Sequence, residues 1–232
     1  MKISIVIPTY NEEKYIGETL ESLMKQTLKP DEIIIADYNS KDNTKSICES
    51  FNVKFVKVDK PGIGYGRQIG FEHAKGDIFV SASADVFYPI NWLEELTKPL
   101  RKEDIVATIG SISLKDANKI EKIGSYLLNN IFIPMAFSLN LVFASADNLA
   151  IKSNIYKQIK GINPNLQTGE DTDLIIRAKK IGKIIYVKKA NVFTSNRRIR
   201  KWNYLKYIYF HTKNFLSYNL FKKAAKEYEP IR

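Results

Sequence analysis

Four loops of the sequence concentrate carboxylates and hydroxyls, the side chains that hold polar ligands and accept protons. Three of them, residues 9–12, 37–40 and 83–85, each follow an apolar run that predicts a buried strand. The fourth, residues 169–173, places three acidic residues at the start of a predicted helix, where backbone N–H groups can orient a carboxylate. Asn, Asp and Ser are also common in turns and helix caps, so one such loop means little. Three loops that converge on one edge favour a ligand-binding site.

The elements that position these loops follow a strand–helix alternation. Apolar runs predict strands at residues 3–9, 32–36, 53–58 and 77–81, and helices over 12–26, from Asp42, and over 66–75. Asn11 is the expected cap of the first helix. This order predicts an α/β fold, a Rossmann-like, mostly parallel sheet flanked by helices. Ligands bind such sheets at the carboxyl ends of the strands, where the loops lie.

The second half of the chain is less regular. Residues 123–146 carry no charge but include Pro134, and their longest apolar run is far below the ~18–20 residues that span a bilayer. The default interpretation is a buried helix and a buried strand on either side of Pro134; a lipid-facing surface is the alternative. A helix from 170, ending at Gly182, and strands at 183–187 and 190–194 follow.

Composition limits the class of protein. The chain has 232 residues, 44% hydrophobic and 26% charged, which excludes a largely disordered protein. The single Cys48 excludes a disulfide framework and a cysteine-based zinc site, and fits a reducing compartment. The apolar run at 3–8 is too short for a secretory signal. We therefore expect a cytoplasmic location, peripheral on the inner face of the cell membrane if the C-terminal tail binds lipid.

The net charge of +11 is concentrated at the C-terminus. Residues 197–232 contain ten Lys or Arg and two Glu, together with nine aromatic residues. From Lys201 the pattern predicts an amphipathic helix whose apolar face comprises Trp202, Leu205, Ile208, Tyr209, Phe215, Leu216 and Leu220. Three interpretations compete: a helix packed on the domain with its cations in solvent, an interfacial helix over 197–226 on an anionic membrane, and nucleic-acid binding. The third is weakest because no nucleic-acid recognition motif accompanies the tail.

Several motifs, in order along the chain, resemble those of family 2 glycosyltransferases with the GT-A fold. They are IVIPTYNE at 5–12, DYNSKDNT at 37–44, GYGRQIG at 64–70, AKGD at 74–77, NLAI at 148–151, GI at 161–162 and GEDTDLIIR at 169–177. The resemblance covers about residues 3–200. It implies an inverting transfer of a sugar from a nucleotide-sugar donor to an acceptor hydroxyl by a small soluble or peripheral member. The expected domains are a catalytic unit at 1–196, with a nucleotide-binding half at 1–115 and an acceptor half at 116–196, and a tail at 197–232.

The resemblance also implies the roles of individual residues. Asp171 matches the general base, with Glu170 beside it as helper, and Asp85 would ligate Mg²⁺ or Mn²⁺. His211 is a further candidate ligand, and the alternative for it is a partly packed helix histidine. The nucleotide-binding residues it implies are Pro8, Thr9, Tyr10, Glu12, Asp37, Asn39, Arg67, Ser83 and Ala84.

Two segments depart from the family pattern. Ser83-Ala84-Asp85 stands in place of Asp-x-Asp, so the metal-binding carboxylate is kept and the other is lost. The Gln-x-x-Arg-Trp motif of processive members lacks its Gln at 198–202, which argues against a polysaccharide synthase. The preceding segment resembles the S-x-R-R of small relatives, in which arginines, here Arg197 and Arg198, face the diphosphate.

The acceptor and the activity keep alternatives open. The basic tail and the uncharged stretch suggest a lipid-linked or membrane-proximal hydroxyl acceptor, and no nucleic-acid partner is expected. Because Ser83 replaces the first Asp of the metal motif, one alternative is a catalytically impaired protein that binds a nucleotide-sugar and a membrane. A sugar nucleotidyltransferase would need a Gly-rich loop after the first strand, which residues 8–12 lack.

Overall fold

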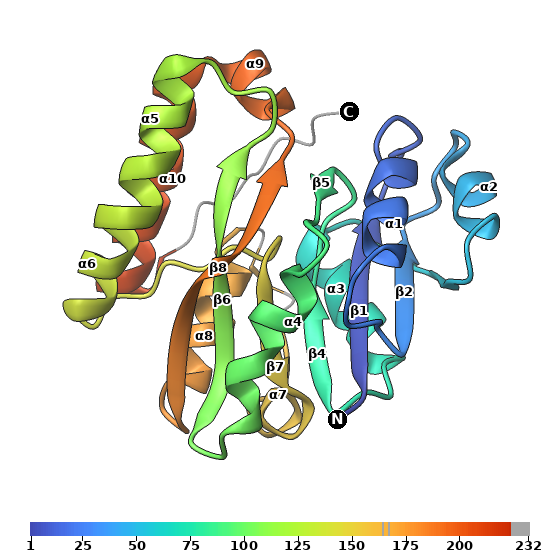
Figure 1. The fold of residues 1–232 in the computed structure, drawn as a ribbon, viewed down its shortest axis with the longest axis horizontal. Helices are drawn as coiled ribbons and strands as arrows, with labels where there is room; N and C mark the ends of the chain where they lie inside the picture. The colour runs from blue at the N-terminus through green and yellow to red at the C-terminus, as the bar shows by residue number, and fades with distance from the viewer. Residues whose placement is uncertain (164, 167, 224–232) are drawn as a thin grey trace.

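Within residues 1–163, 165–166 and 168–223, which the computed structural model describes, an eight-stranded sheet has helices on both faces (Figure 1). The strands are β1 Ile3–Thr9, β2 Glu32–Asp37, β3 Lys54–Lys57, β4 Ile78–Ser81, β5 Val86–Phe87, β6 Ile105–Leu114, β7 Leu149–Lys152 and β8 Lys183–Thr194. The α-helices are α1 Ile16–Met24, α2 Thr44–Glu49, α3 Ile63–Glu72, α4 Trp92–Thr97, α5 Lys119–Leu127, α6 Ile133–Ser138, α7 Ser153–Gln158, α8 Glu170–Ala178, α9 Arg197–Trp202 and α10 Tyr204–Phe221. A 3₁₀ turn, η1 Lys98–Arg101, and a π-helical turn, η2 Leu128–Phe132, complete them.

The spatial order of the strands is β3-β2-β1-β4-β7-β6-β8-β5. The first four strands of the chain run parallel, as the alternation of strands and helices predicts, and β6 and β8 are also parallel. β7 is antiparallel to β4 and to β6, and the short β5 is antiparallel to β8. The predicted α/β sheet with flanking helices is confirmed. Because β7 runs against β4, residues just before β7 lie at the edge where β4 ends.

Apolar side chains cover both faces of the sheet. On one face, Leu20 of α1 and Trp92 of α4 belong to the core; on the other, Phe71 of α3 and Leu174 of α8 do. Helix α3 lies so close to β1 that a Cβ on Gly70 would stand 2.3 Å from Val6 Cγ1. This close packing fixes the helix that carries Arg67 against the strand that leads into the first polar loop.

The uncharged stretch at 123–146 differs from the prediction of a helix and a strand separated at Pro134. The chain is helical from α5 through η2 into α6, and no strand forms over these residues. Pro134 lies in the first turn of α6, directly after the π-helical turn, a position where a helix tolerates the missing N–H. A proline therefore interrupts the regular hydrogen-bond pattern without ending the helix.

Helix α10 buries only part of the apolar face that the sequence predicts. Trp202, which ends α9, and Phe215 are buried. The other five members are exposed: Leu205, Ile208, Tyr209, Leu216 and Leu220. The last cations of the predicted tail, Lys226 and Arg232, lie outside the described residues.

Polar and aromatic contacts determine which side of α10 meets the domain. The Tyr218 hydroxyl donates to Asp173 of α8 over 2.6 Å, and the Asn219 side chain bonds both the N–H and the C=O of Val142. The Phe215 ring centroid lies 5.2 Å from that of Phe132 in η2. These contacts turn most of the apolar residues outward. None of the helices in the described part of the chain is long and apolar enough to cross a membrane.

Candidate functional site

Asp37, which ends β2, is buried and held by donors from two loops. Its Oδ1 accepts from Thr9 Oγ1 over 2.8 Å and from Ser40 Oγ over 2.5 Å, and its Oδ2 accepts the Ser40 N–H over 2.9 Å. The loops after β1 and β2 therefore meet at the carboxyl ends of their strands, as predicted, with one carboxylate at the centre.

Asn11 connects these two loops instead of capping the first helix. Its N–H donates to Ser40 Oγ and its Oδ1 accepts the Lys41 N–H, both over 2.8 Å. Helix α1 begins at Ile16, four residues later than expected. The predicted cap is wrong because the Asn11 side chain bonds the loop after β2, with the backbone in the left-handed region at φ 53°.

The other predicted residues of these loops have different surroundings. The Tyr10 ring centroid lies 5.4 Å from that of Tyr38, and Asn39 is exposed. Pro8 packs beneath α3, and the carbonyl of the buried Ala84 accepts a hydrogen bond from α1. Aromatic rings at the rim offer a surface on which a planar base can stack.

Arg67 of α3 is the centre of a buried network that joins α8 to the loop after β4. Only 2% of its side chain is exposed; Nη1 donates to Glu170 over 2.8 Å and Nη2 to Ser83 Oγ over 3.1 Å. The Ser83 hydroxyl in turn donates to Asp147. The structure thus joins three predicted residues and adds Asp147, which the sequence analysis missed.

Glu170 and Asp171 begin α8 after Gly169, which has a left-handed backbone at φ 69°. Burial and the adjacent charge of Asp171 raise the pKa of Glu170 to about 7, although Arg67 opposes the shift. Burial also raises the pKa of Asp171, whose two oxygens accept the N–H groups of Thr172 and Ala146 over 2.6 and 2.9 Å. Backbone donors therefore orient the Asp171 carboxylate, as predicted for this helix start.

Asp85 and Glu12 are bridged by one guanidinium. Arg197 donates from Nη1 and Nη2 to the two Glu12 oxygens over 2.8 and 3.0 Å, and its Nε lies 2.8 Å from Asp85 Oδ2. Its guanidinium also lies 4.8 Å from the Tyr15 ring centroid. Burial raises the pKa of Asp85 to about 6 despite Arg197. The predicted metal ligand and the predicted diphosphate ligand thus contact each other.

Carboxyl groups outnumber the guanidiniums bound to them among the described residues of this site. Its interacting carboxylates are Glu12, Asp85, Asp147, Glu170 and Asp171. The guanidiniums bound to them are those of Arg67 and Arg197. No three described His, Cys, Asp or Glu side chains are grouped so that they alone could hold a metal ion. The donor set suits a hard cation that takes one or two carboxylates and completes its shell with other oxygens.

His211 and Arg198 lie on the side of the crevice formed by the C-terminal helices. The His211 ring of α10 is tilted by 50° against that of Tyr207, with ring centroids 4.4 Å apart, and burial and Arg198 lower the His211 pKa to about 4. Its imidazole is therefore neutral at physiological pH, the form that ligates metals. Arg198 lies over the Trp202 ring at 4.9 Å.

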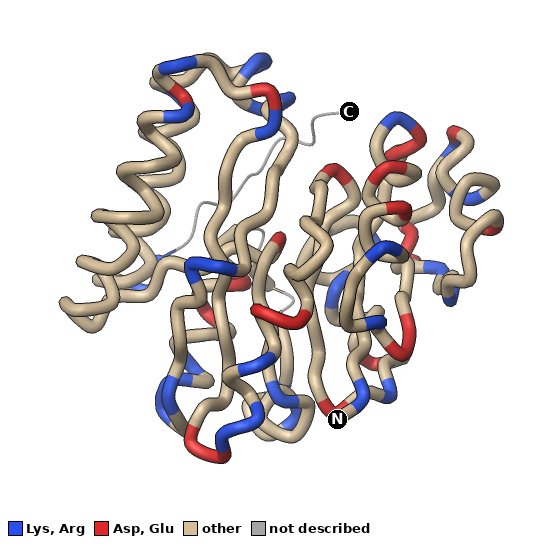
Figure 2. The backbone as a smooth tube through the Cα atoms, in the orientation of Figure 1, with Lys and Arg blue, Asp and Glu red and all other residues tan. Residues whose placement is uncertain are grey.

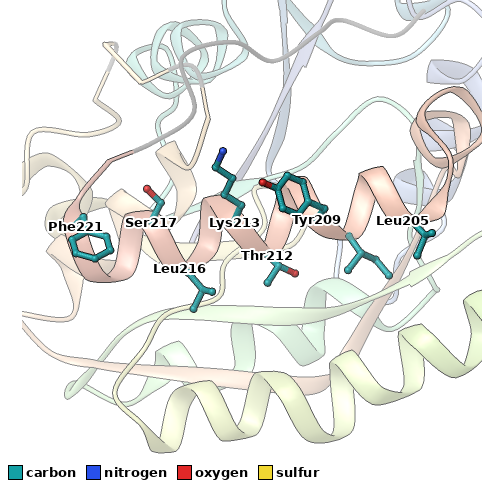
Figure 3. A pocket seen from close by; sticks show the side chains of 8 residues that line it. Leu205, Tyr209, Thr212, Lys213, Leu216, Ser217 and Phe221 are labelled. Carbon is teal, nitrogen blue, oxygen red and sulfur yellow. The ribbon is translucent and has the colours of Figure 1, made fainter.

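An open hollow on the surface of α10 lies away from these carboxylates. It measures about 630 Å³, and all its lining residues belong to α10; Figure 3 shows their side chains: Leu205, Ile208, Tyr209, Thr212, Lys213, Leu216, Ser217 and Phe221. It is an apolar surface feature, separate from the candidate catalytic crevice.

Asp147 and the Arg197 ion pairs could not be found from local patterns. The only sequence signal for Asp147 is that it directly precedes the 148–151 motif. Its position beside Ser83 depends on β7 being antiparallel to β4. Arg197 meets Glu12 from 185 positions away.

Solved structures with the same fold support the architecture. TarS of *S. aureus*, residues 1–349 in complex with UDP, has a TM-score of 0.67 and 21% identity, covering 93% of this chain and 66% of that one. Glucosyl-3-phosphoglycerate synthase of *Mycobacterium tuberculosis*, in complex with Mn²⁺, UDP and phosphoglyceric acid, has a TM-score of 0.66 and 19% identity, covering 93% and 76%. The predicted GT-A-type fold is confirmed.

Curated relatives and a family model identify the family. The glycosyltransferase GlyG of *Streptococcus pneumoniae* is 32% identical over 115 residues, 47% of this chain and 38% of the relative. An uncharacterized glycosyltransferase of Rickettsia typhi is 27% identical over 196 residues, which cover 79% of this chain and 60% of that relative. The chain thus spans less than two thirds of either relative. The model of glycosyl transferase family 2 matches residues 4–160. This chain belongs to glycosyl transferase family 2.

Proposed function

We propose that this chain is an inverting, metal-dependent glycosyltransferase that moves a sugar from a nucleotide-sugar donor to an acceptor hydroxyl. The observation that carries the proposal is the Asp171 carboxylate, oriented by two backbone N–H groups at the start of α8. Asp171 takes the proton of the acceptor hydroxyl as its oxygen attacks the anomeric carbon. Attack opposite the departing nucleoside diphosphate inverts that carbon. The raised pKa of Asp171 makes it a better proton acceptor than an exposed aspartate.

The donor nucleotide is proposed to bind at the ends of β1 and β2. Thr9 and Asp37 would hold the base and ribose, with the rings of Tyr10 and Tyr38 at the rim. The UDP complex of the similar TarS structure supports a uridine nucleotide as the first candidate. Arg197 would give up its contact with Asp85 and bind diphosphate oxygens instead, because one guanidinium has too few N–H groups to bind both anions fully.

A divalent cation is proposed at Asp85. The donor diphosphate is itself an anion, and the crevice already holds more carboxylates than guanidiniums among its described residues. When bound, Mg²⁺ or Mn²⁺ would neutralise the diphosphate as it departs. The Mn²⁺ in the similar synthase structure supports this assignment. His211 stays a candidate ligand through its neutral imidazole.

A nucleotide screen tests the proposal by thermal unfolding. We expect UDP and UDP-sugars with Mn²⁺ to raise the melting temperature by on the order of 5–10 °C at ~100 times Kd. Asp37→Asn should remove most of that shift, whereas Asp31→Asn, at the far end of β2, should keep it. The absence of a shift with any nucleotide would contradict the donor site. A shift without turnover on any acceptor would instead favour the catalytically impaired binding protein.

The acceptor is proposed to be membrane-proximal, because two neighbouring helices carry exposed apolar side chains. Figure 1 places α5 and α6 beside α10, and the Phe132 and Phe215 rings join them. The exposed side chains are Ile120, Ile123, Tyr126, Leu127, Ile131, Met135 and Leu139, then Leu205, Ile208, Tyr209, Leu216, Leu220 and Phe221. Figure 2 shows few acidic positions there. The described residues 117–146 and 197–223 contain a single acid, Glu121, which pairs with Arg200.

Vesicle co-sedimentation tests this surface. We expect binding to vesicles with anionic lipid, weaker binding to neutral vesicles, and release by salt, since each cation near such a surface contributes about 1 kcal/mol. Replacing Leu205, Leu216 and Leu220 together by Ser should lower binding at least about tenfold, because their burial in lipid is lost. Ile90→Ser, an equally exposed apolar site on another surface, is the control. Unchanged binding by the triple variant would contradict the assignment.

A further inference from the structure

Asp147 and Ser83 face each other as an extension of the pairing between two strands. In the antiparallel ladder of β4 and β7, Ser81 is paired with Leu149. Two residues beyond β4 stands Ser83, and two residues before β7 stands Asp147, so the same register continues from the sheet into the crevice. The contact between them follows from the direction of β7 and needs no special loop geometry.

Hydrogen bonds fix the Asp147 segment at two points. The Ser83 hydroxyl donates to Asp147 Oδ1 and accepts from Arg67. The Tyr88 hydroxyl donates to the Asp147 carbonyl over 3.2 Å and accepts the Ser83 N–H over 3.0 Å. Asp147 is half-buried, and no described residue donates to its Oδ2. One carboxylate oxygen is therefore anchored, which leaves the other as the candidate ligand atom.

Asp147 adds a further carboxylate to a group in which carboxylates outnumber the guanidiniums bound to them. Its charge acts on Asp85, Glu170 and Asp171, so these carboxylates lie near it. Two guanidiniums of this cluster already have carboxylate partners: Arg67 is bound to Glu170, and Arg197 to Glu12 and Asp85. Arg198 is a third cation nearby, since it acts on His211 together with Asp147. A further carboxylate held rigidly in this place costs free energy unless a cation joins it.

We propose that Asp147 is a second carboxylate ligand, with Asp85, of the divalent cation that accompanies the donor, and that Ser83 is the positioning residue that orients it. The proposal rests on the proposed function. Mg²⁺ or Mn²⁺ bound by two carboxylates keeps coordination sites for phosphate oxygens and water. The serine at 83 supplies no charge itself, and Asp147 supplies that charge from the facing segment.

Direct measurement of Mn²⁺ binding, by titration calorimetry or electron paramagnetic resonance, tests this assignment with UDP present and absent. We expect Asp147→Asn to lower Mn²⁺ affinity at least about tenfold, and Ser83→Ala to lower it by a smaller factor that Ser83→Thr recovers. Asp116→Asn, which removes an exposed carboxylate elsewhere, is the charge-matched control and should bind as the parent does. Circular dichroism and thermal unfolding establish that each variant is folded.

An exchange of the two side chains gives a sharper result. Ser83→Asp alone should place two carboxylates in contact and destabilise the protein, and Asp147→Ser alone should lose Mn²⁺ affinity. The double variant Ser83→Asp/Asp147→Ser should recover both, because it returns one carboxylate and one hydroxyl to the facing positions. Parental Mn²⁺ affinity in Asp147→Asn, or a double variant no better than Asp147→Ser, would overturn the inference. If the parent protein binds UDP in the thermal screen and these variants bind Mn²⁺ equally, only the role of Asp147 fails.

Discussion

Asp171→Asn is expected to lower the rate of sugar transfer by about 10²–10⁴-fold while nucleotide binding stays near the parental level. Asparagine keeps an oxygen that can accept the Ala146 N–H but cannot take a proton from the acceptor hydroxyl. The loss should therefore fall on kcat. Initial rates of donor consumption with a competent acceptor measure it, and thermal shifts with UDP report binding separately.

The pH profile gives this prediction a second readout. The carboxylate must be ionised to act as a base, and Glu170, whose pKa is raised to about 7, titrates with it as a neighbour. We expect kcat/KM of the parent to fall as pH drops through about 7, because the buried pair takes up a proton there. Residual activity of Asp171→Asn should lack this dependence.

Asp173→Asn is the matched control for the base. This residue lies in the same turn, but its oxygens accept from Tyr218 and Arg177. Its replacement should lower stability and leave kcat nearly unchanged. Full activity in Asp171→Asn, or an equal loss of kcat in Asp173→Asn, would show that another group is the base.

Arg67→Met is expected to lower the free energy of unfolding by about 1–3 kcal/mol at pH 8, because Glu170 and Ser83 lose a buried hydrogen-bonding partner. Methionine fills much of the space, but it leaves Glu170 buried without its cation; only 7% of the Glu170 side chain is exposed. The penalty should shrink as pH falls, because removal of Arg67 raises the Glu170 pKa further and protonation then neutralises the carboxyl. Urea unfolding at several pH values between 5 and 8 measures this difference.

Two further variants separate charge from packing. Glu170→Gln in the Arg67→Met background should regain much of the lost stability, since no unpaired charge is then buried. Arg101→Met, at an exposed position, should change stability little. A pH-independent loss in Arg67→Met would mean that packing, and not the buried carboxylate, accounts for the effect.

The parallel half of the sheet was predictable because each strand is a short apolar run bounded by turn residues. The strand predicted at 77–81 differs from β4 by a single residue. β7 was not placed, because four residues preceding a helix carry no periodicity that distinguishes a strand or its direction. Apolar spacing gives α10 one apolar face but does not say whether that face packs on the domain. Leu205 and Leu216 are exposed, and hydrogen bonds from Tyr218 and Asn219 set the side that packs inward.

The candidate site divides in the same way between local and distant signals. Asp37 and Asp171 follow from a strand end and a helix start, which short segments encode. The contacts of Ser83 with Asp147 and of Arg197 with Glu12 join segments 64 and 185 positions apart. Such contacts depend on how the whole sheet assembles, so no window of sequence contains them.

Arg197 connects the crevice to the helices on the outer surface. Its guanidinium holds Glu12 and Asp85, and the same residue begins α9, which leads through Asn203 into α10. A donor that draws this guanidinium away from Asp85 therefore acts on the segment that carries the outward apolar side chains. If α10 binds a surface, thermodynamic linkage makes the effect reciprocal. The surface changes the affinity for the donor by the same factor by which the donor changes the affinity for the surface. Substrate loading and attachment to the surface would then be coupled equilibria, and each could be measured through the other.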